Sequence, residues 1–213
     1  MKLILFGAAG DVGRRILNEA LSRGHEVTAV LRRPEQAGTL PSGAVVAIAD
    51  AGRPGAAAAL IPGHDMAISA LRPPAGQEEQ LVPLTRAVLE GAAAAGIPAL
   101  VVGGAATLHL ADDSSHTVLS APGFLPPAVV PIAEACAAQH DMIRAEARGD
   151  WAYLCPPAML EPGARTGRYR TGRDTLVTGS DGQSRISMED FAVALIDEAE
   201  ARRHTGARFT VGW

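Results

Sequence analysis

Residues 7–13 read GAAGDVG, with three glycines spaced three residues apart. The apolar run 3–6 comes directly before them and has the length of a buried strand. After the glycines, apolar residues recur at helical spacing over 12–21, and Gly24 ends that pattern. The segment is therefore predicted to run from a strand through a glycine turn into a helix.

Glycines at this spacing let the turn approach a pyrophosphate, because no Cβ atoms stand between the backbone and the ligand. The free N–H groups at the start of the helix then face the phosphates. The alternative is a tight strand-to-helix turn that binds nothing. The candidate phosphate-binding residues are Gly7, Ala8, Ala9, Gly10, Asp11, Val12 and Gly13.

A second strand is predicted at 26–31, which completes a βαβ unit of the length expected for the first half of a dinucleotide-binding domain. An acidic residue at the end of this strand would suit the ribose hydroxyls of NAD, whereas an arginine suits the 2′-phosphate of NADP. This strand ends in Arg32 and Arg33. NADP(H) is therefore the preferred cofactor, NAD(H) is kept as the second choice, and ordinary surface arginines are the alternative.

Composition limits the chain to one α/β domain, because 213 residues are too few for two domains of ordinary size. With 47% hydrophobic residues and a net charge of −4, there is no basic excess to suggest nucleic acid or an anionic membrane as a partner. Neither a signal peptide nor a segment of transmembrane length is recognised, so a cytoplasmic location is expected. A monomer or a homodimer is expected as well. Cys136 and Cys155 lack metal-site spacing and are expected to be free thiols.

Further strands are predicted at 44–49, 66–71, 99–102 and 151–154, with helices at 52–60 and 77–95 between them. Apolar strands that alternate with helices indicate a doubly wound parallel sheet of Rossmann type, whose ligands bind beyond the carboxyl ends of the strands. That rule nominates further cofactor-binding residues: Arg32, Arg33, Asp50, Ala51, Leu71, Arg72, Gly103, Gly104 and Ala105. Asp50 would accept a hydrogen bond from the adenine amino group, or it simply forms a turn.

The second half of the chain is predicted to carry a long loop at 108–131 near the substrate, and then a helix at 132–148. The last third differs in composition, with a short strand pair expected near Tyr169 and Leu176. Ser187 is expected to cap a helix at 188–201, with Asp190 favouring its positive end, and 208–211 is a final strand.

Four stretches occur together and in order: GAAGDVG, VVGGAAT at 101–107, DWAYLCPPAML at 150–160, and SRISMED at 184–190 with RFTVGW at the end. In this combination the whole chain resembles the atypical short-chain dehydrogenase/reductase family described as NAD(P)H-binding or NADH-flavin reductase-like, and it is similar in architecture to biliverdin IXβ reductase. The resemblance implies one Rossmann-type domain over 1–213, with a cofactor-binding core at 1–155 and a small lobe at 156–213 over the substrate pocket. It also places Pro156, Pro157, Ala158 and Met159 beside the cofactor and its acceptor.

Most members of the wider superfamily use a Tyr-x-x-x-Lys pair to pass a proton to a carbonyl oxygen. That pair cannot form here, because Lys2 is the one lysine of the chain. Thr107 is the nearest hydroxyl to the position where a serine is usual, and His140 is the imidazole of the helix in which the pair would fall. These two are the weak catalytic candidates, with an exposed or locally bonded histidine as the alternative for His140.

The missing acid favours hydride transfer to a flavin or quinone-like acceptor, which can take its protons from water. The first hypothesis is therefore an NADPH-dependent reductase whose main task is to orient the acceptor on the nicotinamide. A noncatalytic NADP(H)-binding redox sensor is the second. Sugar epimerase or dehydratase chemistry is the third, and the loss of the Tyr and Lys pair counts against it.

Overall fold

A mostly parallel sheet forms the centre of the computed structural model, which describes residues 1–112 and 114–213. Asp113, part of the expected loop at 108–131, lies outside the described residues. Eight strands follow the order β3-β2-β1-β4-β5-β6-β10-β8, and only β8 runs antiparallel to its neighbour. The bounds are β1 Lys2–Phe6, β2 Glu26–Leu31, β3 Val45–Ile48, β4 Met66–Ser69, β5 Ala99–Val102, β6 Trp151–Cys155, β8 Arg170–Gly172 and β10 Ala207–Gly212.

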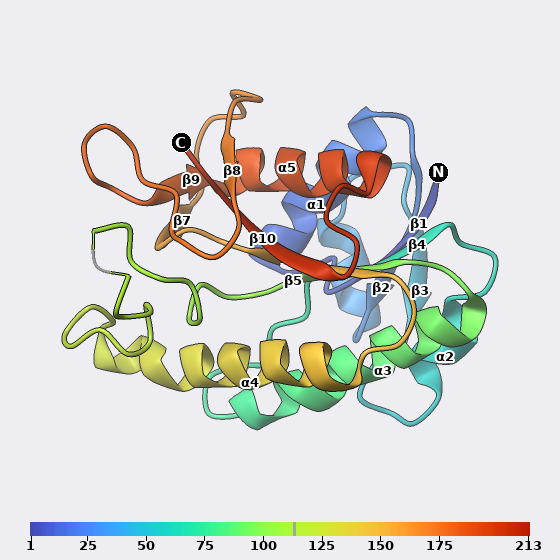
Figure 1. Cartoon of the computed structure of the whole chain (residues 1–213). Helices are drawn as coiled ribbons and strands as arrows, with labels where there is room; N and C mark the ends of the chain where they lie inside the picture. Colours follow the sequence, from blue (N-terminus) through green and yellow to red (C-terminus); the bar gives the residue numbers. More distant parts are fainter. Residues whose placement is uncertain (113) are drawn as a thin grey trace.

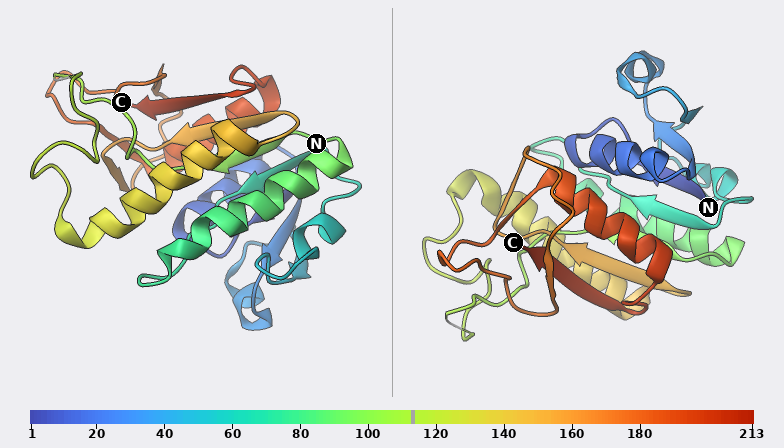
Figure 2. Two further views of the ribbon diagram at one scale, coloured as in Figure 1. Left: turned by 60° about the horizontal axis from the view of Figure 1, so that its bottom comes forward. Right: turned by 90° about the horizontal axis from the view of Figure 1, so that it is seen from above.

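Helices cover both faces of this sheet, so the predicted Rossmann-type architecture is confirmed (Figure 1). Helices α1 and α5 lie side by side on one face, and α3 packs between α2 and α4 on the other (Figure 2). The helices are α1 Asp11–Ser22, α2 Ala56–Leu60, α3 Leu81–Ala95, α4 Val130–Glu146 and α5 Met188–Ala201. No helix of the described residues is both long and apolar enough to cross a membrane.

Strand β1 shows why the sheet is covered twice. Leu3 and Leu5 enter the apolar cluster beneath α1 and α5, whereas Ile4 and Phe6 enter the cluster beneath α2, α3 and α4. All four side chains are fully buried. A strand with side chains alternating between two apolar layers reads as a continuous apolar run, which is the pattern that predicts it.

Several element boundaries differ from the sequence predictions. The predicted helix at 52–60 begins only at Ala56, and the one at 77–95 divides into the 3₁₀ turn η2 Glu78–Gln80 and α3. The predicted loop 108–131 ends early, because η3 Pro127–Val129 leads directly into α4. These differences lie at Pro- and Gly-rich junctions, where local sequence specifies a change of direction but not its exact residue.

The strand pair expected near Tyr169 and Leu176 is wrong. Strand β8 pairs with β10 instead, and the Leu176 N–H donates to the His109 carbonyl at 2.9 Å. A second small sheet was not predicted, in which β7 Met159–Glu161 pairs in parallel with β9 Arg185–Ser187. These pairings join segments far apart in the chain, which local patterns do not reveal.

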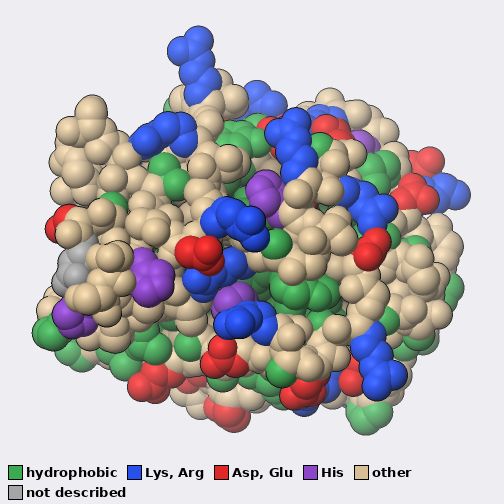
Figure 3. Space-filling view, in the orientation of Figure 1, with side chains coloured by type: hydrophobic (Ala, Val, Ile, Leu, Met, Phe, Trp, Pro, Cys, Tyr) green, Lys and Arg blue, Asp and Glu red, His purple; other side chains and the backbone are tan. Residues whose placement is uncertain are grey.

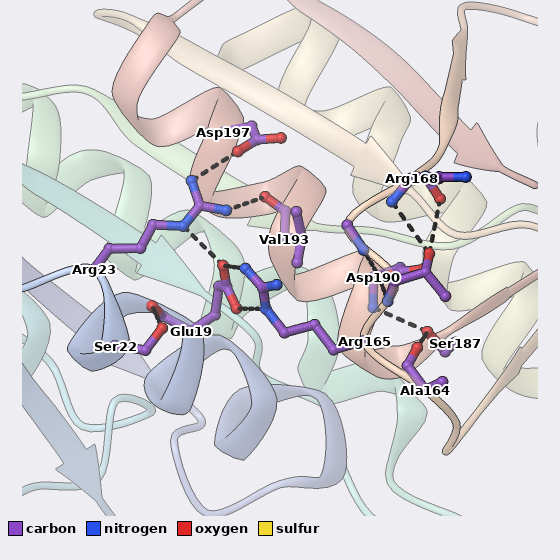
Figure 4. Close-up of polar contacts among 12 residues, drawn as sticks. Glu19, Ser22, Arg23, Ala164, Arg165, Arg168, Ser187, Asp190, Val193 and Asp197 are labelled. Atoms are coloured by element: carbon purple, nitrogen blue, oxygen red, sulfur yellow. Dashed lines mark hydrogen bonds and ion pairs between the residues drawn. The ribbon is translucent and has the colours of Figure 1, made fainter.

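The loops that follow β6 are fastened to α1 and α5 by buried carboxylates (Figure 4). Glu19 is 5% exposed and accepts from Arg23 Nε at 2.8 Å and from Arg165 Nε and Nη2 at 2.7 and 2.8 Å. The hydrogen bonds from Arg165 and Arg23 hold the pKa of Glu19 below its ordinary value, despite its burial. The segment around Arg165 is therefore held against α1.

Asp190 forms the second of these anchors. Its carboxylate is fully buried and accepts from Thr166 N at 2.7 Å, Gly167 N at 2.8 Å, Thr166 Oγ1 and Trp213 Nε1. Ser187 Oγ accepts from the Asp190 N–H at 3.0 Å, so the predicted helix cap is confirmed. The acidic residue of this first helical turn thus binds a loop that approaches the helix.

Candidate functional site

The glycine turn joins β1 to α1 through a close contact with the end of β4. Gly7 has φ of +83°, which favours glycine, and a Cβ at this position would overlap the Ala70 carbonyl. The Gly10 N–H donates to the Gly7 carbonyl at 3.0 Å and closes the turn. Gly7 is therefore required for the chain to turn where β1 and β4 lie together.

Gly13 allows α1 to start directly above that turn. A Cβ on Gly13 would overlap the Gly7 carbonyl, so only glycine permits this separation. Gly10 is the N-cap residue and has no side chain to cap the helix, and the first helical bond runs from Arg14 N to Gly10 O at 2.9 Å. The preceding N–H groups of the first turn are the kind of donors that bind phosphate.

A pocket of about 610 Å³ opens beside this turn, at the carboxyl ends of the strands. Its lining includes eight of the residues nominated from the sequence: Gly7, Ala9, Gly10, Arg32, Asp50, Ala51, Leu71 and Arg72. The lining also includes residues that were not predicted from the sequence, among them Gln36, Arg53, Pro54, Pro73 and Gln80. In the strand order, β2 and β4 lie on opposite sides of β1, and the pocket opens at this reversal of the order. Doubly wound sheets bind ligands at this position.

The polar groups of the pocket fit a polyanionic nucleotide. Arg32, Arg53 and Arg72 line it, and none of them forms an ion pair within the described residues. Asp50 is the one carboxylate of its lining, and its Oδ1 accepts from the Gly52 N–H at 3.0 Å. The glycine cradle and three guanidiniums therefore match the groups that hold a pyridine dinucleotide, and Asp50 shapes its own turn.

The double glycine at the end of β5 accommodates Tyr153 of β6. A Cβ on Gly103 would overlap the Tyr153 ring, and one on Gly104 would come within 2.7 Å of Cys136 Sγ. The Gly104 N–H donates to the Tyr153 hydroxyl at 3.2 Å, and that hydroxyl donates to Gln139 Oε1 at 2.9 Å. Gln139 Nε2 in turn donates to Thr85 Oγ1 at 2.7 Å.

The sequence did not reveal this buried series of hydrogen bonds, because a tyrosine within an apolar strand is typical of an ordinary core residue. Burial raises the pKa of Tyr153 well above its ordinary value, so the hydroxyl stays protonated. The adjacent double glycine was the available signal, since two glycines after a strand indicate a close approach. Gly103 and Gly104 thus have a packing role, and their contact with a cofactor stays a prediction.

The thiols near this strand end are free, as predicted, within the described part of the chain. Burial raises the pKa of Cys136 to about 11, although the nearby Arg72 guanidinium opposes the shift. Burial likewise raises the pKa of Cys155 to about 12. Both thiols are therefore protonated and weakly reactive at neutral pH.

His140 lies inside the fold. It is 5% exposed, and its ring centroid is 5.1 Å from that of Tyr153. Burial, aided by the positive charges of Arg208 and Arg144, lowers the pKa of His140 to about 4. The imidazole is therefore neutral at pH 7 and carries no acidic proton to give.

Thr107 is held by Arg208 from the start of β10. Arg208 Nη1 donates to Thr107 Oγ1 at 2.6 Å and to its carbonyl at 3.1 Å, while Arg208 Nε donates to Asp174 Oδ1 at 2.8 Å. No hydrogen bond among the described residues joins Thr107 to His140. The structure thus places the two catalytic candidates in separate contacts, and a catalytic role for either stays a prediction.

A family model described as NAD(P)H-binding matches residues 7–199, from the glycine turn to α5. This chain belongs to the NAD(P)H-binding family. The uncharacterised protein YwnB of Bacillus subtilis is 34% identical to it over 99% of this chain and 98% of its own length.

Two solved structures are similar over the whole chain. A Bacteroides thetaiotaomicron protein described provisionally as an epimerase has a TM-score of 0.90 and 36% identity, over 100% of this chain and 96% of its own. A Streptococcus pneumoniae protein described provisionally as an NADH-flavin reductase has a TM-score of 0.89 and 28% identity, over 100% and 99%. Family membership thus establishes a pyridine-nucleotide-binding chain and supports oxidoreductase activity.

The other nominated residues of this NAD(P)H-binding chain do not line the pocket. Arg33 donates its backbone N–H to Gln36 Oε1 at 3.0 Å, where η1 Pro34–Thr39 begins. After β6, Ala158 N and Met159 N donate to Ser184 Oγ and O at 3.3 and 2.9 Å. Roles in cofactor binding stay predictions for these and for Ala8, Asp11, Val12, Gly13, Ala105, Pro156 and Pro157.

Arginines and acidic side chains are interspersed on the face shown in Figure 3, rather than gathered into one basic patch. The guanidiniums that matter for the site are distinguished by the pocket they line. Their charge alone does not distinguish them from the other arginines, whereas their position at the carboxyl ends of the strands does.

Proposed function

We propose that this NAD(P)H-binding protein is an NADPH-dependent reductase of a flavin or quinone-like acceptor. NADPH, when bound, supplies the hydride, and a proton from water completes the reduction of the acceptor. The observation that carries this proposal is that the titratable side chains around Gly103 and Gly104, where β5 ends, offer no acid for an acceptor. Within the described residues there, His140 is neutral, Cys136 is a protonated thiol of high pKa, and Tyr153 is buried.

The roles of this chain's residues follow from their positions. The glycine turn and the first N–H groups of α1 bind the pyrophosphate, while Arg32 binds the 2′-phosphate and Asp50 and Ala51 flank the adenine. Leu71 and Arg72 follow β4, the strand between β1 and β5, and line the same pocket, which supports a role for them on the β5 side of the pyrophosphate. In this proposal the segment 156–159 would form a wall of the acceptor site.

Orientation is then the main catalytic contribution of the protein. Hydride transfer between stacked rings needs close approach, and holding two rings in register removes much of the entropic barrier. Ketone reduction would need a proton at the developing oxyanion, and the chain has no Tyr-x-x-x-Lys pair to provide it. The same absence argues against epimerase chemistry, despite the provisional description of the Bacteroides relative.

A noncatalytic redox sensor that binds NADP(H) is the second candidate. The buried, neutral state of His140 favours it to the same degree, because binding needs no proton transfer. The two candidates differ in turnover alone.

The deciding experiment follows NADPH and NADH oxidation by the purified protein with FMN, FAD and a panel of small quinones. A parallel fluorescence titration measures the Kd of each cofactor. The reductase predicts turnover with at least one acceptor and faster oxidation of NADPH. Tight NADPH binding without turnover across the panel would refute it in favour of the sensor.

A further inference from the structure

The loop after β3 brings a second guanidinium to the pocket that Arg32 lines. Ala49 N donates to the Leu31 carbonyl at 2.8 Å, so the ends of β2 and β3 stay side by side. Arg32 follows the first of these strand ends, and Arg53 follows the second. Both line the same pocket, which they enter from neighbouring loops.

The loop that carries Arg53 is ordered by its own hydrogen bonds. The Arg53 N–H donates to the Asp50 carbonyl at 3.0 Å, and Gly52 N donates to the Asp50 side chain at 3.0 Å. The Arg53 carbonyl then accepts from Ala56 N at 3.1 Å, where α2 begins. The backbone of Arg53 is thus set before any ligand arrives, which limits the entropy lost on binding.

Charge indicates what these two side chains bind. Neither guanidinium has an anionic partner within the described residues. A phosphomonoester carries a charge of about −1.5 to −2 at pH 7, and planar guanidiniums match its oxygens with paired donors. Two arginines around one group suit such a phosphate better than they suit a pair of uncharged ribose hydroxyls.

We infer that Arg53 and Arg32 together hold the 2′-phosphate of NADP(H), so that Arg53 is a determinant of cofactor choice. The inference rests on the NADPH preference in the proposed function. It is independent of the acceptor and of turnover. It adds to Arg32 a residue from a different loop, and it makes Asp50 the residue that positions Arg53.

Isothermal titration calorimetry with adenosine 2′,5′-bisphosphate and 5′-AMP tests this inference without any redox step. We expect Arg53→Ala to raise the Kd of the bisphosphate roughly tenfold, about 1.4 kcal/mol, with the Kd of 5′-AMP changed less than about twofold. Arg32→Ala should act in the same way. Because both hold one group, the double variant should lose less than the product of the two single losses.

Arg148→Ala is the matched control. Arg148 is exposed and lies between α4 and the amino-terminal end of β6, whereas the pocket lies at the carboxyl ends of the strands. Its replacement therefore removes one positive charge without touching the pocket. Arg53→Lys should keep part of the preference, because lysine retains the charge but not the paired donors.

Three outcomes would overturn the inference in distinguishable ways. Selective loss in Arg32→Ala but not in Arg53→Ala would keep the NADPH preference and remove Arg53 from the phosphate site. Equal losses for both ligands in Arg53→Ala would reduce its role to general electrostatic attraction. If the unmodified protein binds both ligands equally, the NADPH preference itself fails, and Arg53 loses its proposed role with it.

Discussion

Because His140 is buried and has a lowered pKa, we expect mild acidification to destabilise the fold. Its imidazole is 5% exposed, and burial first, then the charges of Arg208 and Arg144, lower its pKa from 6.5 to about 4. Asp141 and Asp174 oppose that shift without cancelling it. Between these two pKa values the unfolded chain binds a proton that the folded chain rejects, so the stability present above pH 6.5 is lost as the pH falls.

The size of the effect follows from the two pKa values. At pH 7 the unfolded imidazole is mostly neutral, and the linkage term is only about 0.2 kcal/mol. At pH 5 the unfolded imidazole is almost fully protonated, and the term reaches about 2 kcal/mol. The free energy of unfolding should therefore fall by about 1.8 kcal/mol from pH 7 to pH 5 through His140 alone.

Urea unfolding at both pH values, for the protein and for His140→Gln, isolates this term. Glutamine does not titrate, so the pH-dependent loss in the variant should be smaller by about 1.8 kcal/mol. The difference between the two chains cancels the other titrating groups. Equal losses in the two chains would refute a buried, neutral His140 and would restore it as a proton donor.

Two further changes test the turn and the C-terminal anchor. Gly13→Ala should cost about 2 kcal/mol in urea unfolding and weaken NADPH binding at least tenfold, because the new Cβ overlaps the Gly7 carbonyl; Gly38→Ala, which meets nothing within 4 Å, should change neither, and equal behaviour would contradict the close contact. Asp190→Ala should cost about 4 kcal/mol by leaving four donors without their acceptor, while exposed Glu90→Ala stays within about 0.5 kcal/mol. A loss below about 1 kcal/mol for Asp190→Ala would show that the loop is held by other contacts.

The glycine turn and its flanking strand were predictable because their signals are local. Apolar residues on both sides of β1 indicate a strand buried on two faces, and glycines at 7, 10 and 13 indicate a close turn into a helix. The pocket was predictable indirectly, from the predicted topology, since parallel strands bring their carboxyl ends to one edge of the sheet. Arg32, Asp50 and Arg72 were found in this way.

Other parts of the site depend on register and long-range packing. Arg53 reaches the pocket because Leu31 pairs with Ile48, a register that no motif in the sequence specifies. His140 lies on a helix with little periodicity, so its burial against Tyr153 could not be derived from spacing. Charge patterns alone cannot distinguish an arginine that lines a pocket from one that faces solvent.

The position of β10 has a consequence for how the chain folds while it is being synthesised. This strand is inserted between β6 and β8, so one edge of β6 has no partner until residues 207–212 have left the ribosome. A nascent chain that ends at β6 would expose a strand edge able to pair with another chain. The segment after β6 is therefore not an independent cap, because β10, the strand that follows it, is built into the central sheet.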